Sequence, residues 1–187
     1  MWIEFDNVIN ARDLGGLPAA DGRKVKPARL LRGAGLELAS DRDVMRLQEL
    51  QLRHIVDFRD ARERSTHPDR EIPGALYHSV AALPGLPGKP PEDGIPDFDA
   101  VFRSLYAALA ESPHSIAAYR EFFRILLDCR EGAVYFHCAQ GKDRTGIAAI
   151  LVLSALGVPQ HEIMADYFLS RVGLRAAMNA PPHFALF

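Results

Sequence analysis

The segment 133–156 constrains the fold most, because its hydrophobic pattern changes within a few residues. AVYFHC, residues 133–138, is a short apolar run typical of a buried strand, and TGIAAILVLSAL, residues 145–156, is long enough for a buried helix. Gly157 then ends the helix before Pro159. A strand that enters a helix through the short loop AQGKDR predicts part of a layered α/β domain.

Capping residues and periodicity predict the remaining elements. Ser40 and Asp43 precede apolar positions at helical spacing, which indicates a capped helix. HIVDF, residues 54–58, predicts a strand, and Asp60 predicts a cap for a turn that contains Glu63. Further helices are expected over 98–110, 113–128 and 160–172. The expected fold is α/β, with a central, mainly parallel sheet flanked by helices.

Composition favours one soluble globular domain over residues 1–187, since 48% of the residues are hydrophobic and 25% are charged. The Pro- and Gly-rich stretch 81–99 predicts one long surface loop, either a functional lid or a tolerated insertion. A formal net charge of −2 argues against binding to nucleic acid. The 2 cysteines show no zinc spacing and are expected to be reduced.

No basic start followed by an apolar run marks a cleavable Sec signal. The longest apolar stretch, residues 146–158, is shorter than the roughly 20 residues that span a bilayer. We therefore expect no stable membrane insertion, and a location in the cytoplasm or export without a cleavable signal.

The stretch HCAQGKDRTG, residues 137–146, carries the chemistry. A loop between a strand end and a helix start turns backbone N–H groups inward, where the helix dipole also favours an anion. The same field favours a thiolate at Cys138, and Arg144 supplies a planar fork for two phosphoryl oxygens. The residues expected to bind phosphate are Ala139, Gln140, Gly141, Lys142, Asp143 and Arg144.

HCAQGKDRTG resembles the Cys-x5-Arg signature of the cysteine-dependent protein tyrosine phosphatase superfamily. Four further segments resemble a bacterial branch of tyrosine and serine phosphatases that includes a secreted mycobacterial enzyme of broad specificity: NARDLGGL (10–17), LLRGAGL (30–36), VDFRDARERSTHPD (56–69) and ADYFLS (165–170). Members of this branch commonly continue past the last motif into helices that help cover the site. This chain stops at Phe187, either as a natural short form, for which the resemblance implies a more open pocket, or as a shortened piece of a longer chain.

The resemblance implies that Cys138 attacks phosphorus to form a cysteinyl-phosphate, which water hydrolyses with no metal or other cofactor. The alternative is an inert buried thiol. The Thr145 hydroxyl either stabilises the thiolate or caps the helix. His137 is expected to position Cys138 and influence its pKa rather than to act as an acid or base.

The sequence leaves the identity of the general acid undecided among several carboxyl groups. Asp57 is ranked first because it ends the strand of residues 54–58, where the sites of parallel sheets lie. Its alternative is capping or an ion pair with Arg59 or Arg62. Asp143 lies in the loop itself, as the acid or as a structural carboxylate. A third choice is an acid from the Pro-rich loop: Asp93, Asp97 or Asp99.

Three further residues have two interpretations each. Lys142 suits a substrate with additional phosphates, such as a phosphoinositide, but it is otherwise a solvated side chain, and Ala139 stands where phosphoinositide phosphatases place a second basic residue. Arg12, with Asp13, predicts a turn with a salt link that anchors the N-terminal segment, and the secondary interpretation is that it supports the site from behind the residues that touch the phosphate. Cys129 is expected to pack in the core, with a redox partnership with Cys138 as the alternative.

The sequence predicts a metal-independent phosphatase of phosphotyrosine, with phosphoserine, phosphothreonine and phosphoinositides as further substrates. The expected partner is thus a phosphorylated protein or a phosphoinositide, while the oligomeric state is open. The competing functions are a catalytically silent phosphate-binding module, a sulfurtransferase and an arsenate reductase that use the same cysteine loop.

Overall fold

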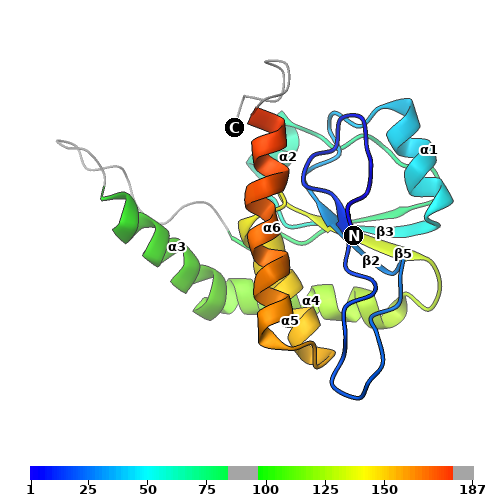
Figure 1. Cartoon of the computed structure of the whole chain (residues 1–187). Helices are drawn as coiled ribbons and strands as arrows, with labels where there is room; N and C mark the ends of the chain where they lie inside the picture. Colours follow the sequence, from blue (N-terminus) through cyan, green and yellow to red (C-terminus); the bar gives the residue numbers. More distant parts are fainter. Residues whose placement is uncertain (84–96, 179–187) are drawn as a thin grey trace.

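A computed structural model describes residues 1–83 and 97–178 of the chain (Figure 1). The strands are β1 (Arg12–Asp13), β2 (Leu30–Gly33), β3 (Leu52–Asp57), β4 (Leu76–Ser79) and β5 (Ala133–His137). They form one sheet in the order β1-β2-β5-β3-β4, in which β1 is antiparallel to β2 and all other neighbours are parallel. The mainly parallel sheet expected from the sequence is confirmed.

The helices are α1 (Asp41–Glu49), α2 (Ala61–Thr66), α3 (Phe98–Glu111), α4 (Pro113–Asp128), α5 (Asp143–Ala155) and α6 (Gln160–Met178). Each expected helix is present, but α5 begins two residues earlier than predicted and α6 continues past residue 172. Across the described ranges, no helix combines the length and apolar character needed to cross a membrane.

The predicted Pro-rich loop falls largely on residues 84–96, outside the described residues, and so does Asp93. The two other candidate acids of this stretch open α3. Asp97 is the N-cap, whose side chain accepts a hydrogen bond from the Ala100 amide, and Asp99 lies in the first turn. Asp97 is therefore engaged in capping.

Both predicted caps are confirmed, and each is a reciprocal capping box. Ser40 accepts from the Asp43 amide, and the Asp43 side chain accepts from the Ser40 amide. Asp60 and Glu63 make the same reciprocal pair at the start of α2. Each box satisfies two backbone donors that a helix start would leave without partners.

Apolar side chains fill both faces of the sheet. In Figure 1, α1 lies on one side and α4 and α5 on the other. The core beneath α4 and α5 is centred on the rings of Phe58, Phe122 and Phe136, all fully buried. Phe122 packs with ring centroids 5.4 Å from Phe58 and 5.0 Å from Phe136. A second core, which includes Leu47 of α1, covers the opposite face.

The strand register determines where the polar site lies. His137 at the end of β5 pairs with Asp57 at the end of β3 and with Gly33 at the end of β2. Three parallel strands thus end at one edge, and the loops that follow them meet there.

Replacing Phe122 by Ala should lower the free energy of unfolding by about 3–5 kcal/mol, since it removes a fully buried ring and leaves a cavity. Urea denaturation measures the change. Leu127→Ala on the same helix is the control, because Leu127 is 70% exposed, and it should change the free energy by less than about 0.5 kcal/mol. Equal losses in the two variants would contradict the assigned core.

Candidate active site

The loop 138–144 leaves β5 and enters α5. Gly141 has a φ of +66°, and a Cβ at this position would lie 2.1 Å from the carbonyl oxygen of Gly33. Only glycine fits such a left-handed conformation so close to another backbone. The turn therefore depends on this residue. Lys142 is the N-cap of α5 but makes no side-chain capping bond, and Asp143 is the first helical residue.

Cys138 is buried at the base of this loop, with 3% of its surface exposed. Burial alone raises the pKa of its thiol. Arg144, the hydroxyl and amide of Thr145, and His137 outweigh that effect and lower the pKa below its ordinary value. The environment thus favours the thiolate, which is the nucleophilic form. Thr145 is the third residue of α5, so it is not the helix cap.

Arg144 is held by a carboxylate from another helix. Its Nη1 donates to Glu63 Oε2 at 2.5 Å, and its Nη2 donates to Glu63 Oε1 at 2.7 Å. The Oε2 atom also accepts from the Asp60 amide at 2.9 Å, so the capping box of α2 holds the carboxylate in place. Burial raises the pKa of Glu63, but Arg144 and the Asp60 amide lower it overall, and Glu63 is ionised. This end-on pair fixes the guanidinium plane and leaves its Nε side for another anion.

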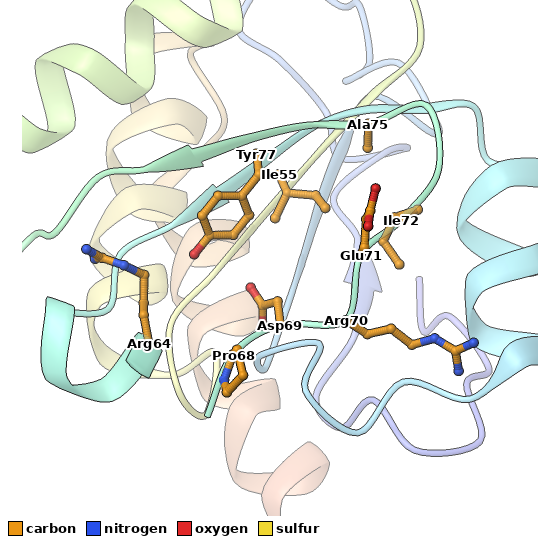
Figure 2. A pocket seen from close by; sticks show the side chains of 9 residues that line it. All are labelled: Ile55, Arg64, Pro68, Asp69, Arg70, Glu71, Ile72, Ala75 and Tyr77. Atoms are coloured by element: carbon orange, nitrogen blue, oxygen red, sulfur yellow. The ribbon is translucent and has the colours of Figure 1, made fainter. Parts of the chain in front are cut away.

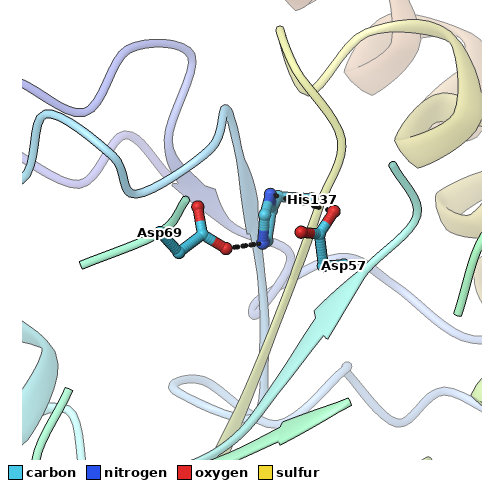
Figure 3. A group of neighbouring side chains, drawn as sticks. All are labelled: Asp57, Asp69 and His137. Carbon is cyan, nitrogen blue, oxygen red and sulfur yellow. Dashed lines mark ion pairs between the residues drawn. The ribbon is translucent and has the colours of Figure 1, made fainter. Parts of the chain in front are cut away.

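His137 lies in a buried charged cluster behind the cysteine (Figure 3). Its Nε2 is 3.0 Å from Asp69 Oδ2, and its Nδ1 is 4.0 Å from Asp57 Oδ1. Burial lowers the pKa of His137, but these two carboxylates raise it to about 9. Arg59 pairs with the same two carboxylates, both at 2.8 Å. A third carboxylate, Glu37, lies 3.4 Å from Arg59, so the cluster holds two cations among three anions.

Asp57 makes the ion pair with Arg59 that the sequence left as its alternative role. It is fully buried and accepts from the amide and guanidinium of Arg59 and, at 2.6 Å, from the Tyr77 hydroxyl. Burial raises its pKa, but His137, Arg59 and Tyr77 lower it overall. A carboxylate held ionised in this way does not suit proton donation, in contrast to the first rank that the sequence gives it.

The donor atoms of Asp57, Asp69 and His137 all lie within 4.8 Å of one another, a spacing that could hold a metal ion. The carboxylates are already engaged by Arg59, the Leu36 amide and Tyr77. We therefore interpret the cluster as a support for the loop.

Asp143 lies at the mouth of the loop, with 26% of its side chain exposed. It accepts a hydrogen bond from the Tyr106 hydroxyl of α3, and that hydroxyl contacts the Tyr167 hydroxyl of α6 at 2.6 Å. Lys142 Nζ is 3.5 Å from the same carboxylate and 5.9 Å from the centre of the Phe102 ring. Aromatic side chains thus flank this carboxylate on one side.

Two buried arginines anchor the loop from below. Arg12 and Arg32 each contact Asp166 of α6 at 2.6 Å. Asp13 instead accepts from the amides of Gly15 and Ala28. The N-terminal segment is therefore anchored through the ion pair of Arg12 with α6, and Asp13 contributes amide hydrogen bonds in place of the predicted salt link.

A pocket of about 380 Å³ lies beside β4 (Figure 2). Its lining includes Tyr77 and Asp69, which also belong to the charged cluster, and Ile55 and Ile72 from the apolar wall. Cys138 and Arg144 do not line it. This pocket therefore lies behind the loop and is not where a substrate would meet the cysteine.

Cys129 is the C-cap of α4 and precedes β5, whereas Cys138 follows β5. Its thiol is buried and donates to the Glu131 carbonyl oxygen. The 5 residues of β5 lie between the two cysteines and span about 16 Å, since each residue rises about 3.3 Å. A disulfide between them is excluded in this fold.

The sequence did not identify the partners of its own site residues. It predicted Glu63 only as part of a helical turn, and it did not single out Asp69, Arg32, Tyr106 or Asp166. A signal was present, because Arg32, Asp69 and Asp166 lie in the segments 30–36, 56–69 and 165–170, respectively. Those segments carry a resemblance but no indication of which side chains meet.

Together, a parallel sheet and a cysteine-to-arginine loop that enters a helix define a cysteine-based phosphatase fold. A solved structure of a kinase-associated phosphatase, with its catalytic cysteine replaced by serine, superposes with a TM-score of 0.51 at 16% identity, covering 86% of this chain and 83% of that one. The sequence profile of the tyrosine phosphatase family matches residues 3–184, and the chain belongs to this family.

Two relatives are informative. A Cupriavidus necator protein classed by name as a tyrosine-protein phosphatase is 40% identical over 179 residues, covering 90% of this chain and 62% of its own length. The triple specificity protein phosphatase PtpB of Mycobacterium tuberculosis is 26% identical over 192 residues, covering 89% of this chain and 68% of its own length. The chain therefore spans about three fifths to two thirds of the length of these relatives.

The charged state of His137 should make stability depend on pH. Its pKa is about 9 in the folded chain, above the ordinary value of 6.5, so its contribution is fully present below pH 6.5 and is lost as the pH rises through 9. The free energy of unfolding in urea should be higher for wild type than for His137→Gln at pH 6, and this difference should shrink as the pH rises to 9.5. His161→Gln, a change at an exposed histidine, should follow wild type. A constant difference between wild type and His137→Gln would contradict a protonated His137.

Proposed function

We propose that this chain is a metal-independent phosphatase that hydrolyses phosphotyrosine through a cysteinyl-phosphate at Cys138. The observation that carries the proposal is the loop itself. It joins a buried thiol of lowered pKa to a guanidinium that Glu63 holds in one plane. A thiolate beside a fixed cationic fork is suited to attack a phosphoryl group and to stabilise its equatorial oxygens.

The proposed reaction has two steps. The Cys138 thiolate attacks phosphorus, an Sγ–P bond forms, the bond from phosphorus to the leaving oxygen breaks, and an acid gives that oxygen a proton. Water then attacks phosphorus, the Sγ–P bond breaks, and the acid's conjugate base takes a proton from the water. Backbone amides from Ala139 to Arg144 bind the phosphoryl oxygens. The Thr145 hydroxyl stabilises the thiolate as it leaves.

We assign the general acid to Asp143 rather than to Asp57. Asp143 is partly exposed beside the loop, where a leaving oxygen can reach it, whereas Asp57 is fully buried and engaged by Arg59. Proton transfer needs hydrogen-bonding contact with the leaving group first and a suitable pKa second. The partial exposure of Asp143 beside the loop supports its assignment on the first requirement.

The aromatic side chains around Asp143 favour an aryl phosphate. Phe102 and Tyr106 present apolar surface beside Lys142 and Asp143. Phosphoserine and phosphothreonine are secondary substrates in this proposal. Phosphoinositides rank below them, because Lys142 already has Asp143 as a partner.

The other functions of a cysteine loop have less support. An arsenate reductase needs a nearby partner thiol, and Cys129 lies at the opposite end of β5. A catalytically silent phosphate-binding module usually lacks the cysteine or the arginine, and both are present here. A sulfurtransferase typically has a shorter loop.

Cys138→Ser and Arg144→Lys should each reduce kcat for phosphotyrosine peptide by about a thousandfold or more, because the first removes the thiolate and the second removes the planar fork. Phosphate release in the presence of EDTA measures the rate. Cys129→Ala is the matched control and should keep the wild-type rate. An inactive wild type that still binds phosphopeptide would instead indicate a silent binding module.

Asp143→Asn should slow hydrolysis of phosphotyrosine peptide about a hundredfold, and p-nitrophenyl phosphate much less, because p-nitrophenolate leaves without a proton. Asp57→Asn should lower the melting temperature and slow both substrates by the same factor, since it disturbs the cluster around His137. The ratio of the two substrates' rates is the readout. If Asp57→Asn changed this ratio and Asp143→Asn did not, the assignment would be reversed.

A further inference from the structure

Two buried arginines share one carboxylate beneath the 138–144 loop. Arg12 Nε contacts Asp166 Oδ1 and Arg32 Nη1 contacts Asp166 Oδ2, with side-chain exposures of 1% for Arg12, 0% for Arg32 and 7% for Asp166. In the two described ranges, no second carboxylate lies within 4.0 Å of either guanidinium. The group therefore carries one positive charge in excess.

The excess belongs to Arg32 more than to Arg12. The Arg12 guanidinium lies 5.5 Å from the centre of the Trp2 ring and also donates to Asn10 and Ser170. The buried Arg32 Nε has no hydrogen-bond partner among residues 1–83 and 97–178. Burial and Arg12 lower the pKa of Arg32 to about 10, so it remains protonated at neutral pH.

Each other cation at the loop has its own carboxylate. Arg144 pairs with Glu63, Lys142 with Asp143, and His137 with Asp69. The charges of Arg144 and His137 are thus balanced before any ligand binds, while Lys142 lies beside the carboxyl group of Asp143. A bound oxyanion or a thiolate would thus balance the charge of Arg32.

Arg32 also holds the carbonyl side of the loop, together with Asn10 and Gly35. The Ala139 oxygen accepts from the Gly35 amide at 3.1 Å, and the Gln140 oxygen accepts from Asn10 Nδ2 at 3.0 Å. The Gly141 oxygen accepts from Asn10 Nδ2 at 3.1 Å and from Arg32 Nη2 at 2.9 Å. In a trans peptide the C=O and the following N–H point in opposite directions. Fixing these three oxygens outward therefore turns the amides of residues 140, 141 and 142 toward the inside of the loop.

We propose that Arg32, with Asn10, Arg12 and Asp166, is a positioning unit that aims the loop amides at a bound oxyanion and places an excess positive charge beneath it. Arg32 acts through the loop and does not touch the substrate. The proposal rests on the proposed function in one respect, that Cys138 is the nucleophile within the same loop.

The test measures the pKa of Cys138 from the pH dependence of its alkylation by iodoacetamide, and the affinity for inorganic phosphate from protection against that alkylation. A Cys129→Ala background leaves Cys138 as the only thiol. The titratable and charged groups whose charges interact with Cys138 come from β2, α4, β5 and α5: Arg32, Tyr119, Tyr135, His137 and Arg144. The variants leave the last four of these unchanged.

Arg32→Met should raise the pKa of Cys138 by about one unit and weaken phosphate protection about tenfold, since it removes both the charge and the bond to Gly141. Arg29→Met is the matched control. Arg29 precedes the same strand but donates to the carbonyls of Cys129 and Arg130 at the other end of β5, so both measurements should stay at wild type.

Asp166→Asn separates a charge effect from a structural one. It removes a negative charge from the same group, so the pKa of Cys138 should fall, whereas Arg32→Met should raise it. If both variants raised the pKa alike, the group would be only structural and the proposal would fail. The proposal would also fail if Arg32→Met had the same Cys138 pKa and the same phosphate protection as wild type.

Two variants that conserve the charge test whether this unit orients the loop amides. They decide this point even if circular dichroism shows that Arg32→Met does not fold. Asn10→Gly suits the left-handed φ of +57° at this position. It removes the two bonds to the loop and the bond that Asn10 Oδ1 accepts from Arg12, and it changes no charge. Asn10→Gly and Arg32→Lys should weaken phosphate protection several-fold with little change in the pKa of Cys138. Unchanged protection in both would refute the aiming role.

The wild type distinguishes this proposal from the proposed function. If it alkylates with an ordinary thiol pKa and phosphate gives no protection, the proposed function is wrong. If wild type and Arg32→Met both show a low Cys138 pKa and protection by phosphate, only the proposal of a positioning unit is wrong.

Discussion

The rest of the site depends on the hydrogen bonds that hold the carbonyl groups of the 138–144 loop. Three consecutive oxygens accept from Gly35, Asn10 and Arg32, and none of these donors is near the loop in sequence. Buried backbone groups without partners are costly, so a loop that turns its amides toward a ligand must have its carbonyls satisfied from elsewhere. The Gly141 turn and the position of Cys138 both follow from this anchoring.

Charge balance is the second organising feature. Glu63 holds Arg144, and Asp69 and Asp57 hold His137 and Arg59, so that most cations around the cysteine are paired before a ligand arrives. Paired and buried cations keep their orientation, which is what electrostatic stabilisation of a phosphoryl group requires. These pairs join the loop to α2 and to the segment between α2 and β4.

The sheet order explains why segments so far apart in the sequence meet. β5 lies between β2 and β3, so the residues after all three strands share one edge, and α6 packs against α5 beneath the loop. Asn10, Arg32, Glu63 and Asp166 therefore converge on a loop that begins more than 70 residues after Glu63. The four segments that resemble family motifs are the pieces of this single assembly.

The sequence alone determined the α/β class, the helices, the two capping boxes and the loop from Cys138 to Arg144, because each depends on residues close together in the chain. Local spacing also led to an uncertain choice between Asp57 and Asp143. Only the tertiary structure showed that Asp57 is buried against Arg59, that Glu63 holds Arg144 and that Arg32 lies under the loop. Ion pairs and burial across distant segments depend on strand order and helix packing, which no local pattern in one sequence encodes.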